Sequence, residues 1–172
     1  KACREIGFLV ISGHDVPEAL IADMHAMSGD YFGLPFWEKM RHKLPADRLR
    51  GYSPQESHSL AYSMNEETPT DLRESWNMGP FDHPFDEYHF SESGAGYFPP
   101  NIWPDRPENM RGLCESYYRE MEKLAGNLMR IFALALDLQE DFFEAKIDKH
   151  ITCFCINHYP AQPEPPLKKQ LR

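Results

Sequence analysis

The sequence has 172 residues, of which 41% are hydrophobic, and it carries a formal net charge of −9. A chain of this length and composition can bury a core, which excludes an intrinsically disordered protein. Because acidic residues are in excess, we expect neither nucleic acid nor an anionic membrane as a partner. No apolar stretch comes near the ~18 residues that a membrane span needs.

The cysteines favour a reducing, cytoplasmic setting. There are 4 of them, and they form no Cys-x-x-Cys pair and no dense disulfide framework. Cys153 and Cys155 lie in an apolar run, so we expect both to be buried as small hydrophobic side chains, with metal binding as the alternative. The chain begins without methionine and ends without a closing element, and both ends resemble cuts through a larger protein.

The first predicted elements are a strand and a helix. Residues 6–12 form a short apolar run that is typical of a buried strand. Asp15 and Glu18 have the spacing of a capping box, which predicts a helix start. The helix is expected to end near residues 33–35, with one or two further turns over 36–41. Its apolar stripe comprises Leu20, Met24, Met27 and Tyr31.

Residues 45–104 are rich in proline, glycine and aromatic residues and show no sustained period. Because a solvated linker would not carry so many aromatic side chains, we interpret them as ordered, irregular and functional structure. One short strand is expected at residues 74–78. The acidic and histidine residues between Asp82 and His89 are interpreted as a polar surface loop, because no histidine in the chain precedes Asp or Glu by two positions.

The strongest periodic signal lies between residues 110 and 138, where apolar positions are spaced 3-4-4-3-4-3-4-3. This predicts a helix of about eight turns that Asp105 and Glu108 can cap. The spacing also permits a coiled coil, but the Pro-rich and aromatic flanks favour a helix that backs a sheet. A turn and short helix over 138–145 and a strand over 151–157 are expected next. The strand should point Thr152, Phe154 and Ile156 to one face and Cys153, Cys155 and Asn157 to the other.

Several segments, taken in order, resemble landmarks of the isopenicillin N synthase-like superfamily of 2-oxoglutarate/Fe(II)-dependent oxygenases. Each motif alone is weak, and their order along nearly the whole chain makes the resemblance specific. In the first of them Asp15 replaces the usual glycine. The segments are residues 6–17 (IGFLVISGHDVP), 31–40 (YFGLPFWEKM), 50–52 (RGY), 71–76 (DLRESW), 101–104 (NIWP), 141–143 (DFF) and 155–160 (CINHYP).

The resemblance implies an α+β fold. Residues 1–150 would form the N-terminal oxygenase region, with strand, helices, an aromatic loop region and a long backing helix. Residues 151–172 would begin the Fe(II)/2-oxoglutarate domain, a double-stranded β-helix (jelly-roll) whose barrel is incomplete in this chain. The aromatic region would line or cover the mouth of that barrel.

The resemblance also implies an enzyme. The family oxidises small-molecule substrates with O₂, using Fe(II) and 2-oxoglutarate and releasing succinate and CO₂. Its H-x-D iron pair, distal histidine and Arg-x-Ser would follow the last matched segment. We therefore expect no metal ligand and no catalytic residue within these residues, and an inactive chain until it joins the remainder of its own jelly-roll domain.

The resemblance also implies, position by position, which residues of this sequence bind a ligand. Asn157 and Tyr159 match family positions that contact the co-substrate or substrate, with structural packing as the alternative. Arg50, Tyr52 and Glu74 fall where members can contact substrate, with a surface arginine or strand packing as the alternatives. Two other functions stay open: an isopenicillin N synthase-type oxidase that uses no 2-oxoglutarate, and a non-catalytic interaction domain that keeps only the helical half.

Overall fold

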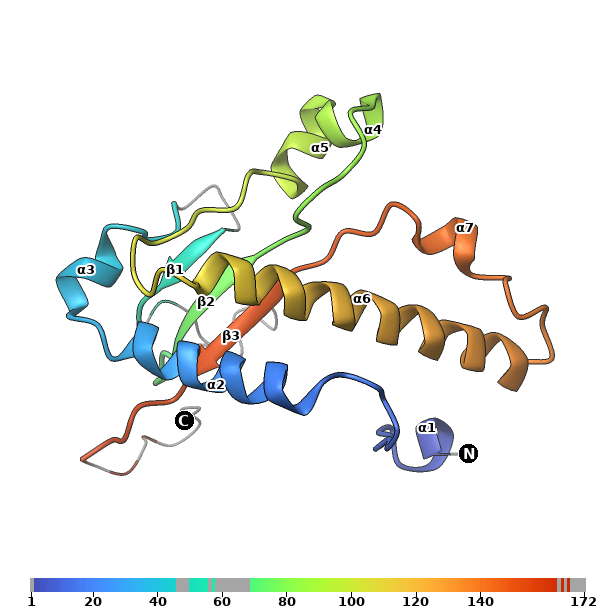
Figure 1. Cartoon of the computed structure of the whole chain (residues 1–172), viewed down its shortest axis with the longest axis horizontal. Helices are drawn as coiled ribbons and strands as arrows, with labels where there is room; N and C mark the ends of the chain where they lie inside the picture. The colour runs from blue at the N-terminus through green and yellow to red at the C-terminus, as the bar shows by residue number, and fades with distance from the viewer. Residues whose placement is uncertain are drawn as a thin grey trace.

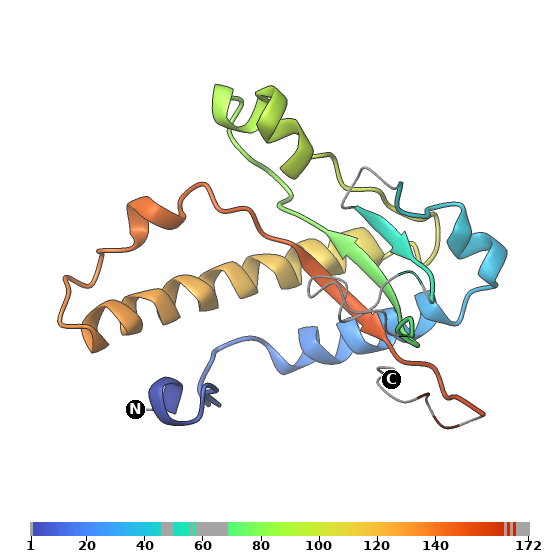
Figure 2. The same ribbon diagram turned by 180° about the vertical axis from the view of Figure 1, so that it is seen from behind.

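A small sheet with helices on one face organises the chain. The computed structural model describes residues 2–45, 50–55, 57, 69–163, 165 and 167. Within them, a three-stranded antiparallel sheet has the order β1-β2-β3. Helices α2 and α6 cover one face of it, as Figures 1 and 2 show from opposite sides. The bounds are β1 Gly51–Ser53, β2 Glu74–Met78, β3 Phe154–His158, α2 Glu18–Phe32 and α6 Met110–Ala135.

Shorter helices surround these two layers. Helices α4 and α5 project away from the sheet at the top of Figure 1, and α7 follows the turn after α6. Among the described residues, no helix combines the length and apolar character that a membrane crossing requires. The bounds are α1 Ala2–Glu5, α3 Phe36–Met40, α4 Glu87–Phe90, α5 Glu92–Tyr97 and α7 Glu144–Ile147.

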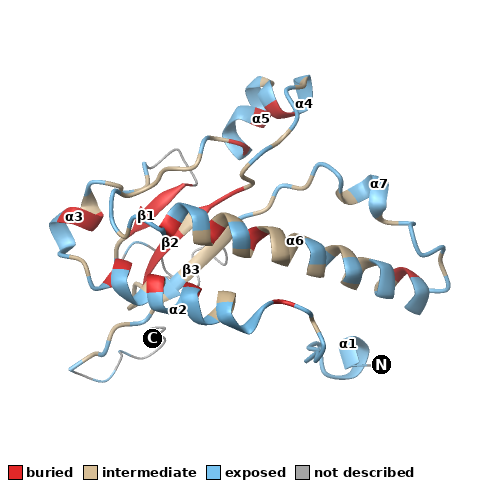
Figure 3. Ribbon diagram, in the orientation of Figure 1, coloured by how far each residue is buried: buried red, intermediate tan, exposed pale blue. Residues whose placement is uncertain are grey.

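The core lies between β2 and the two long helices. Trp76 pairs with Tyr52 on β1 and with Ile156 on β3, so these three side chains share the face that meets the helices. The Trp76 ring lies 5.0 Å from that of Tyr31 in α2. Figure 3 shows buried residues concentrated along β1 and β2 and on the facing turns of α2 and α6, whereas β3 is mostly intermediate. The buried cluster comprises Met24, Met27, Tyr31, Phe32, Tyr52, Trp76, Met78, Met110 and Cys114.

The long helix backs the sheet, as the sequence predicts. Its N-terminal half buries Cys114 and Tyr118 against α2 and the strands, and the ring of Tyr117 lies 5.7 Å from that of Phe154. In its C-terminal half, Ile131 and Ala135 of the predicted stripe are exposed, so the apolar stripe continues beyond the surface that covers it. The predicted helices near 18–32 and 36–40 and the strand at 74–78 are likewise confirmed.

The strand predicted at residues 6–12 is wrong. The segment has no regular structure, and its apolar side chains are exposed, with Val10 at 100% and Phe8 at 80%. The physical reason is that a strand needs a neighbour for its backbone hydrogen bonds, and no described strand pairs with it. The capping box is also wrong, because Asp15 has a φ of 57° and the side chain of His14 accepts from Val16 N instead.

Other local predictions also need correction. Helix α6 begins without a side-chain cap from Asp105 or Glu108, because the backbone carbonyl of Pro107 accepts from Met110 N. The region 45–104 contains two short helices, α4 and α5, which Asp86 and Ser91 cap through their side chains. The turn and short helix expected over 138–145 are present, but helix α7 occupies Glu144–Ile147 and so extends two residues beyond the expected range.

The last strand has the predicted alternation but starts later. It begins at Phe154, and Phe154 and Ile156 pack against the core cluster as expected. Cys153 precedes the paired residues and is exposed, so the burial predicted for it is wrong, whereas Cys155 is partly buried. All four cysteines are free thiols.

A buried ion pair joins α3 to the middle of the sheet. Lys39 Nζ lies 2.7 Å from Glu74 Oε2 and 3.0 Å from Glu74 Oε1, and it donates to the carbonyl oxygen of Phe32 at 2.9 Å. Lys39 is 6% exposed and Glu74 5% exposed. Removing either partner would therefore leave an uncompensated charge out of water, which is strongly unfavourable.

Two further side chains, those of Tyr52 and His158, form hydrogen bonds with Glu74. The hydroxyl of Tyr52 donates to Glu74 Oε2, and His158 Nδ1 lies 2.9 Å from Oε1. Burial acts to raise the pKa of Glu74, but the hydrogen bonds from Lys39, Tyr52 and His158 outweigh it and lower that pKa below its ordinary value. Burial together with the Glu74 contact raises the pKa of Tyr52. All three strands, the end of α2 and α3 thus meet at one carboxylate.

Replacing Lys39 by methionine should destabilise the chain by about 3 kcal/mol, because Glu74 stays buried without its cation. Urea unfolding followed by circular dichroism measures the change. The double variant Lys39→Met/Glu74→Gln should recover part of the loss, since no charge is then unpaired. As a control, Lys123→Met removes an exposed partner of Glu120 and should change stability by less than about 1 kcal/mol. Equal losses in the buried and exposed variants would contradict the prediction.

The lowered pKa of Glu74 predicts a pH-dependent contribution to stability. A carboxyl whose pKa is lower in the folded chain stabilises it above the unfolded pKa, and the contribution disappears as the pH falls through the folded value. The difference in unfolding free energy between wild type and Glu74→Gln should therefore be largest near neutral pH and shrink below about pH 4. Urea titrations across this range test it, with Glu120→Gln, whose side chain is 26% exposed and pairs with Lys123, as the control. If the difference in unfolding free energy does not vary with pH, the pKa of Glu74 is not lowered in the folded chain.

Candidate functional site

The second face of the sheet, turned away from α2 and α6, carries the candidate site. Strand alternation and the observed register place Ser53, Ser75, Asn77, Cys155 and Asn157 on this face. Four of the five side chains are polar and the fifth is a thiol. An antiparallel sheet that covers a core with one face can present polar groups on the other. Ser53 and Ser75 are nonetheless buried, at 3% and 2% exposed, so of these five side chains a ligand can reach Asn157 and the partly exposed Asn77 and Cys155.

Asn157 is held by a cross-strand contact on this face. Arg73, which leads into β2, donates from Nη1 to Asn157 Oδ1 at 2.6 Å. The thiol of Cys155 lies 3.3 Å from the same oxygen. Arg73 Nε in turn lies 3.5 Å from Oδ2 of Asp71, a carboxylate that is almost fully buried. A row of three polar side chains, Asp71, Arg73 and Asn157, therefore crosses from the segment before β2 to β3.

Sequence reasoning assigned no role to Arg73 or Asp71, although both belong to the segment 71–76. The usable signal was the spacing, because Arg73 stands two positions before Ser75 and therefore points to the same face. Which residue of another strand it meets depends on the register between β2 and β3. That register pairs Ser75 with Asn157.

Tyr159 follows the last residue of β3 and is 51% exposed. It stands two positions after Asn157, so the structure brings both predicted cofactor-binding residues to one end of the strand. Their side chains are accessible to a ligand on that side. Their roles remain predictions.

Arg50 lies elsewhere and is buried. It is 2% exposed, and its Nη2 donates to the carbonyl oxygen of Tyr97 at 3.0 Å. Its guanidinium lies against Gly79, where a Cβ would come within 2.0 Å of Nη2. Burial lowers the pKa of Arg50. Arg50 is therefore not the surface arginine of the alternative interpretation. Arg50 precedes Gly51, the residue of β1 that pairs with Asn77. Asn157 pairs with Ser75, which lies toward the other end of β2.

Tyr52 and Glu74 are brought together, but on the face that meets the helices. Both belong to the buried network around Lys39, opposite the face that carries Asn157. Their described contacts stabilise the fold, and a role of either residue in substrate binding remains a prediction. The structure thus separates the five predicted residues into three groups. Asn157 and Tyr159 are exposed, Tyr52 and Glu74 are buried together, and Arg50 is buried elsewhere.

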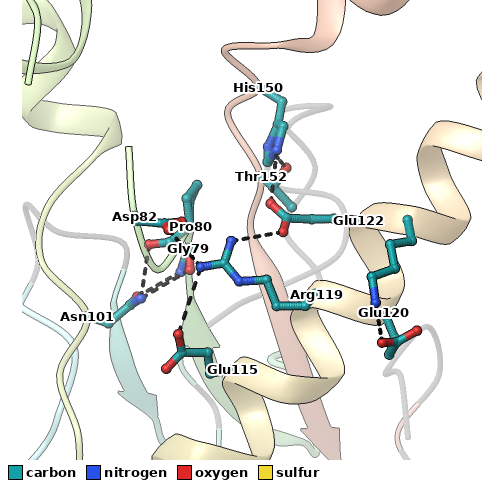
Figure 4. A network of polar contacts seen from close by, with 11 residues as sticks. Gly79, Pro80, Asp82, Asn101, Glu115, Arg119, Glu120, Glu122, His150 and Thr152 are labelled. Carbon is teal, nitrogen blue, oxygen red and sulfur yellow. Dashed lines mark hydrogen bonds and ion pairs between the residues drawn. The ribbon is translucent and has the colours of Figure 1, made fainter. Parts of the chain in front are cut away.

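A surface network holds the segments where β2 ends and β3 begins against α6, at the opposite end of the strands from Asn157 (Figure 4). Arg119 lies 2.8 Å from Asp82 Oδ2 and 3.3 Å from Glu122 Oε2, and Glu122 Oε1 lies 3.2 Å from His150 Nε2. The side chain of Asn101 accepts from the backbone N–H of Gly79 and donates to the carbonyl oxygens of Gly79 and Pro80, directly after β2. The network therefore fixes the loop that leaves β2 and the segment that enters β3.

The polar surface loop predicted between Asp82 and His89 is wrong at its end, because His89 belongs to helix α4 and is 3% exposed. Asp86 accepts hydrogen bonds from the backbone and ring of His89, which with Lys149 hold its pKa well below the usual range. Throughout the described part of the chain, no three His, Cys, Asp or Glu side chains are grouped closely enough to hold a metal ion. The described residues therefore do not fit an iron centre.

Comparison with known proteins identifies the family. The family model described as "non-haem dioxygenase in morphine synthesis N-terminal" matches residues 1–106. Isopenicillin N synthase of Streptomyces griseus is 32% identical over 174 residues, covering 98% of this chain and 50% of that protein. Proline hydroxylase buaE of Petromyces alliaceus is 28% identical over 164 residues, covering 93% and 47%. The chain spans about half the length of the curated relatives it matches.

Solved structures share the fold. A Caulobacter crescentus protein assigned to the 2OG-Fe(II) oxygenase family has a TM-score of 0.73 at 22% identity, covering 88% of this chain and 46% of that one. JOX2, solved in complex with 2OG, Fe and JA, has a TM-score of 0.71 at 24% identity, covering 94% and 43%. Fe(II) and 2-oxoglutarate are the cofactors of the superfamily that these proteins represent. The chain belongs to the non-haem dioxygenase N-terminal family, within the isopenicillin N synthase-like superfamily of 2-oxoglutarate/Fe(II)-dependent oxygenases.

Proposed function

We propose that the chain is the N-terminal part of a non-haem Fe(II)/2-oxoglutarate-dependent dioxygenase. The intact enzyme would oxidise a small-molecule substrate with O₂ and release succinate and CO₂. The family match over residues 1–106 carries this proposal. It is supported by the common fold, which covers 88% and 94% of the chain in the two solved structures.

The chain would provide one wall of the pocket. In this proposal residues 1–150 form the N-terminal region, residues 151–172 begin the jelly-roll domain, and the iron ligands lie outside these residues. Bound Fe(II) and 2-oxoglutarate would supply the oxidising chemistry. Asn157 and Tyr159 would bind the co-substrate or substrate, and the ordered sheet would keep their positions fixed before binding. The four free thiols support a cytoplasmic setting for the intact protein.

The remainder of the jelly-roll domain is the partner that we propose for the uncovered apolar surface. This surface includes residues 6–11, with Phe8 and Val10, and the C-terminal half of α6, with Ile131 and Leu134. A cavity of about 530 Å³ lies between α6 and residues 147–154, with apolar lining from Met121, Met129, Ile147 and Phe154. Surfaces of this kind mark contact sites. A neighbouring strand would also pair with the edge of β3 that no described strand occupies.

A second candidate is an oxidase that uses no 2-oxoglutarate. The 32% identity to isopenicillin N synthase favours it specifically, because that relative is the more similar of the two reported above. The two candidates share a fold and differ in whether a 2-oxo acid is consumed, so an assay of co-substrate turnover separates them.

Turnover of 2-oxoglutarate tests the proposed function directly. The chain extended through its own reading frame should release CO₂ from carboxyl-labelled 2-oxoglutarate when Fe(II), ascorbate and O₂ are present. The 172-residue chain under the same conditions should release none above the buffer. Consumption of O₂ without CO₂ release would favour the oxidase. An extended protein that consumes neither O₂ nor 2-oxoglutarate would favour the non-catalytic interaction domain instead.

Charging the uncovered face of α6 tests the proposed partner surface. The 172-residue chain alone should self-associate or bind a hydrophobic dye, and Ile131→Glu/Leu134→Glu should reduce both, because the two side chains are exposed and apolar. Light scattering and dye fluorescence measure the effect, with far-ultraviolet circular dichroism as the check on folding. A pair of exposed polar residues on α6 with the same change in net charge, Ser116→Glu/Asn127→Glu, serves as control. If both pairs have the same effect, the surface is not the one we propose.

A further inference from the structure

We propose that Arg73 is a positioning residue that fixes the side-chain amide of Asn157, so that Asn157 presents only its N–H groups to the ligand. This inference rests on the proposed function, since it assumes that the open face of the sheet binds a co-substrate. It assigns a role to a residue outside the predicted site. It also defines the kind of ligand atom that can sit beside Asn157.

The register between β2 and β3 brings the two residues together. Ser75 pairs directly with Asn157, and Arg73 precedes Ser75 by two positions on the same face. Arg73 is thus the diagonal neighbour of Asn157, at a distance that a long side chain bridges. Nη1 of Arg73 and Oδ1 of Asn157 are 2.6 Å apart, which is short even for a charge-assisted hydrogen bond.

The chemistry of arginine decides which way the amide points. The two ends of an asparagine side chain have nearly the same shape, so its orientation follows from hydrogen-bond partners. A guanidinium has donors and no acceptor, so the end that faces Arg73 must be the carbonyl oxygen. The thiol of Cys155, 3.3 Å away, donates to the same oxygen. Both acceptor positions of Oδ1 are therefore occupied, and Nδ2 has no partner among the described residues.

The guanidinium of Arg73 also contacts a carboxylate, that of Asp71. Its Nε lies 3.5 Å from Oδ2 of Asp71, whose side chain is 7% exposed. The other carboxylate oxygen of Asp71 is buried without a hydrogen-bond partner in the described part of the chain. Arg73 is therefore the cation that compensates this buried carboxylate, which restrains the guanidinium between Asp71 and Asn157.

The arrangement selects for a hydrogen-bond acceptor. A ligand atom that contacts Asn157 meets two N–H donors, with the positive charge of Arg73 next to them. A carboxylate satisfies both conditions, because it is anionic and accepts hydrogen bonds only. The carboxylate of a 2-oxo acid such as 2-oxoglutarate fits. With the amide reversed, the same position would select a donor such as a ligand hydroxyl or ammonium group.

Nuclear magnetic resonance of the ¹⁵N-labelled chain tests the positioning role without catalysis. Asn157→Asp identifies the side-chain NH₂ signals of Asn157 by their loss. Arg73→Met should shift these signals, because Oδ1 of the same amide loses its charged hydrogen-bond donor, and Arg73→Lys should restore part of the wild-type pattern. Arg130→Met removes an exposed partner of Glu144 in a distant ion pair and should leave the signals unchanged. Unchanged Asn157 signals in Arg73→Met would overturn the proposal.

Folding and ligand binding are checked separately. The indole signal of the buried Trp76 reports whether a variant keeps its core, and Arg73→Lys provides a milder change if Arg73→Met does not fold. In the intact protein without O₂, the Kd for 2-oxoglutarate should rise at least about tenfold in Arg73→Met. An unchanged Kd, with altered Asn157 signals, would overturn the ligand assignment. A wild-type protein that does not bind 2-oxoglutarate would instead refute the proposed function, while the signals of Asn157 still decide the role of Arg73.

Discussion

The buried ion pair of Lys39 and Glu74 is the interaction on which the arrangement of the sheet depends. Glu74 sits at the start of the central strand, and its carboxylate accepts from Lys39 on α3 and from Tyr52 on β1 and contacts His158 on β3. Lys39 also donates to the last residue of α2. Because a buried charge is unfavourable unless every partner is present, these elements can meet at this point only in one relative placement.

That placement sets the geometry of the opposite face. Glu74 pairs with His158, so the neighbouring residue Ser75 pairs with Asn157 and Arg73 reaches the same asparagine. The inward and outward side chains of β2 thus share one register, and a slip by one residue would exchange the two faces. The buried network stabilises the fold, and through the register it also orients the polar groups that we propose to meet a ligand.

Elements with a complete periodic signal could be predicted from the sequence. Helix α2, the strand at Glu74–Met78 and the start of the long helix at Met110 follow from local spacing and burial. The segment 6–12 has an equally clear apolar pattern but no strand to pair with among the described residues, and it remains exposed. Caps at Asp15, Asp105 and Glu108 were not formed, because a cap depends on backbone geometry that residue type does not specify.

By themselves, the order of motifs and the periodicity of apolar residues determined the superfamily, the main helices and the alternation within β3. Tertiary structure alone decided that Arg50 packs beneath Gly79, that Tyr52 and Glu74 face the helices, and that Asn157 meets Arg73. The physical reason is that periodicity tells which residues of one element share a face. It does not tell which partner that face meets, and Arg73 and Asn157 stand 84 positions apart in the chain.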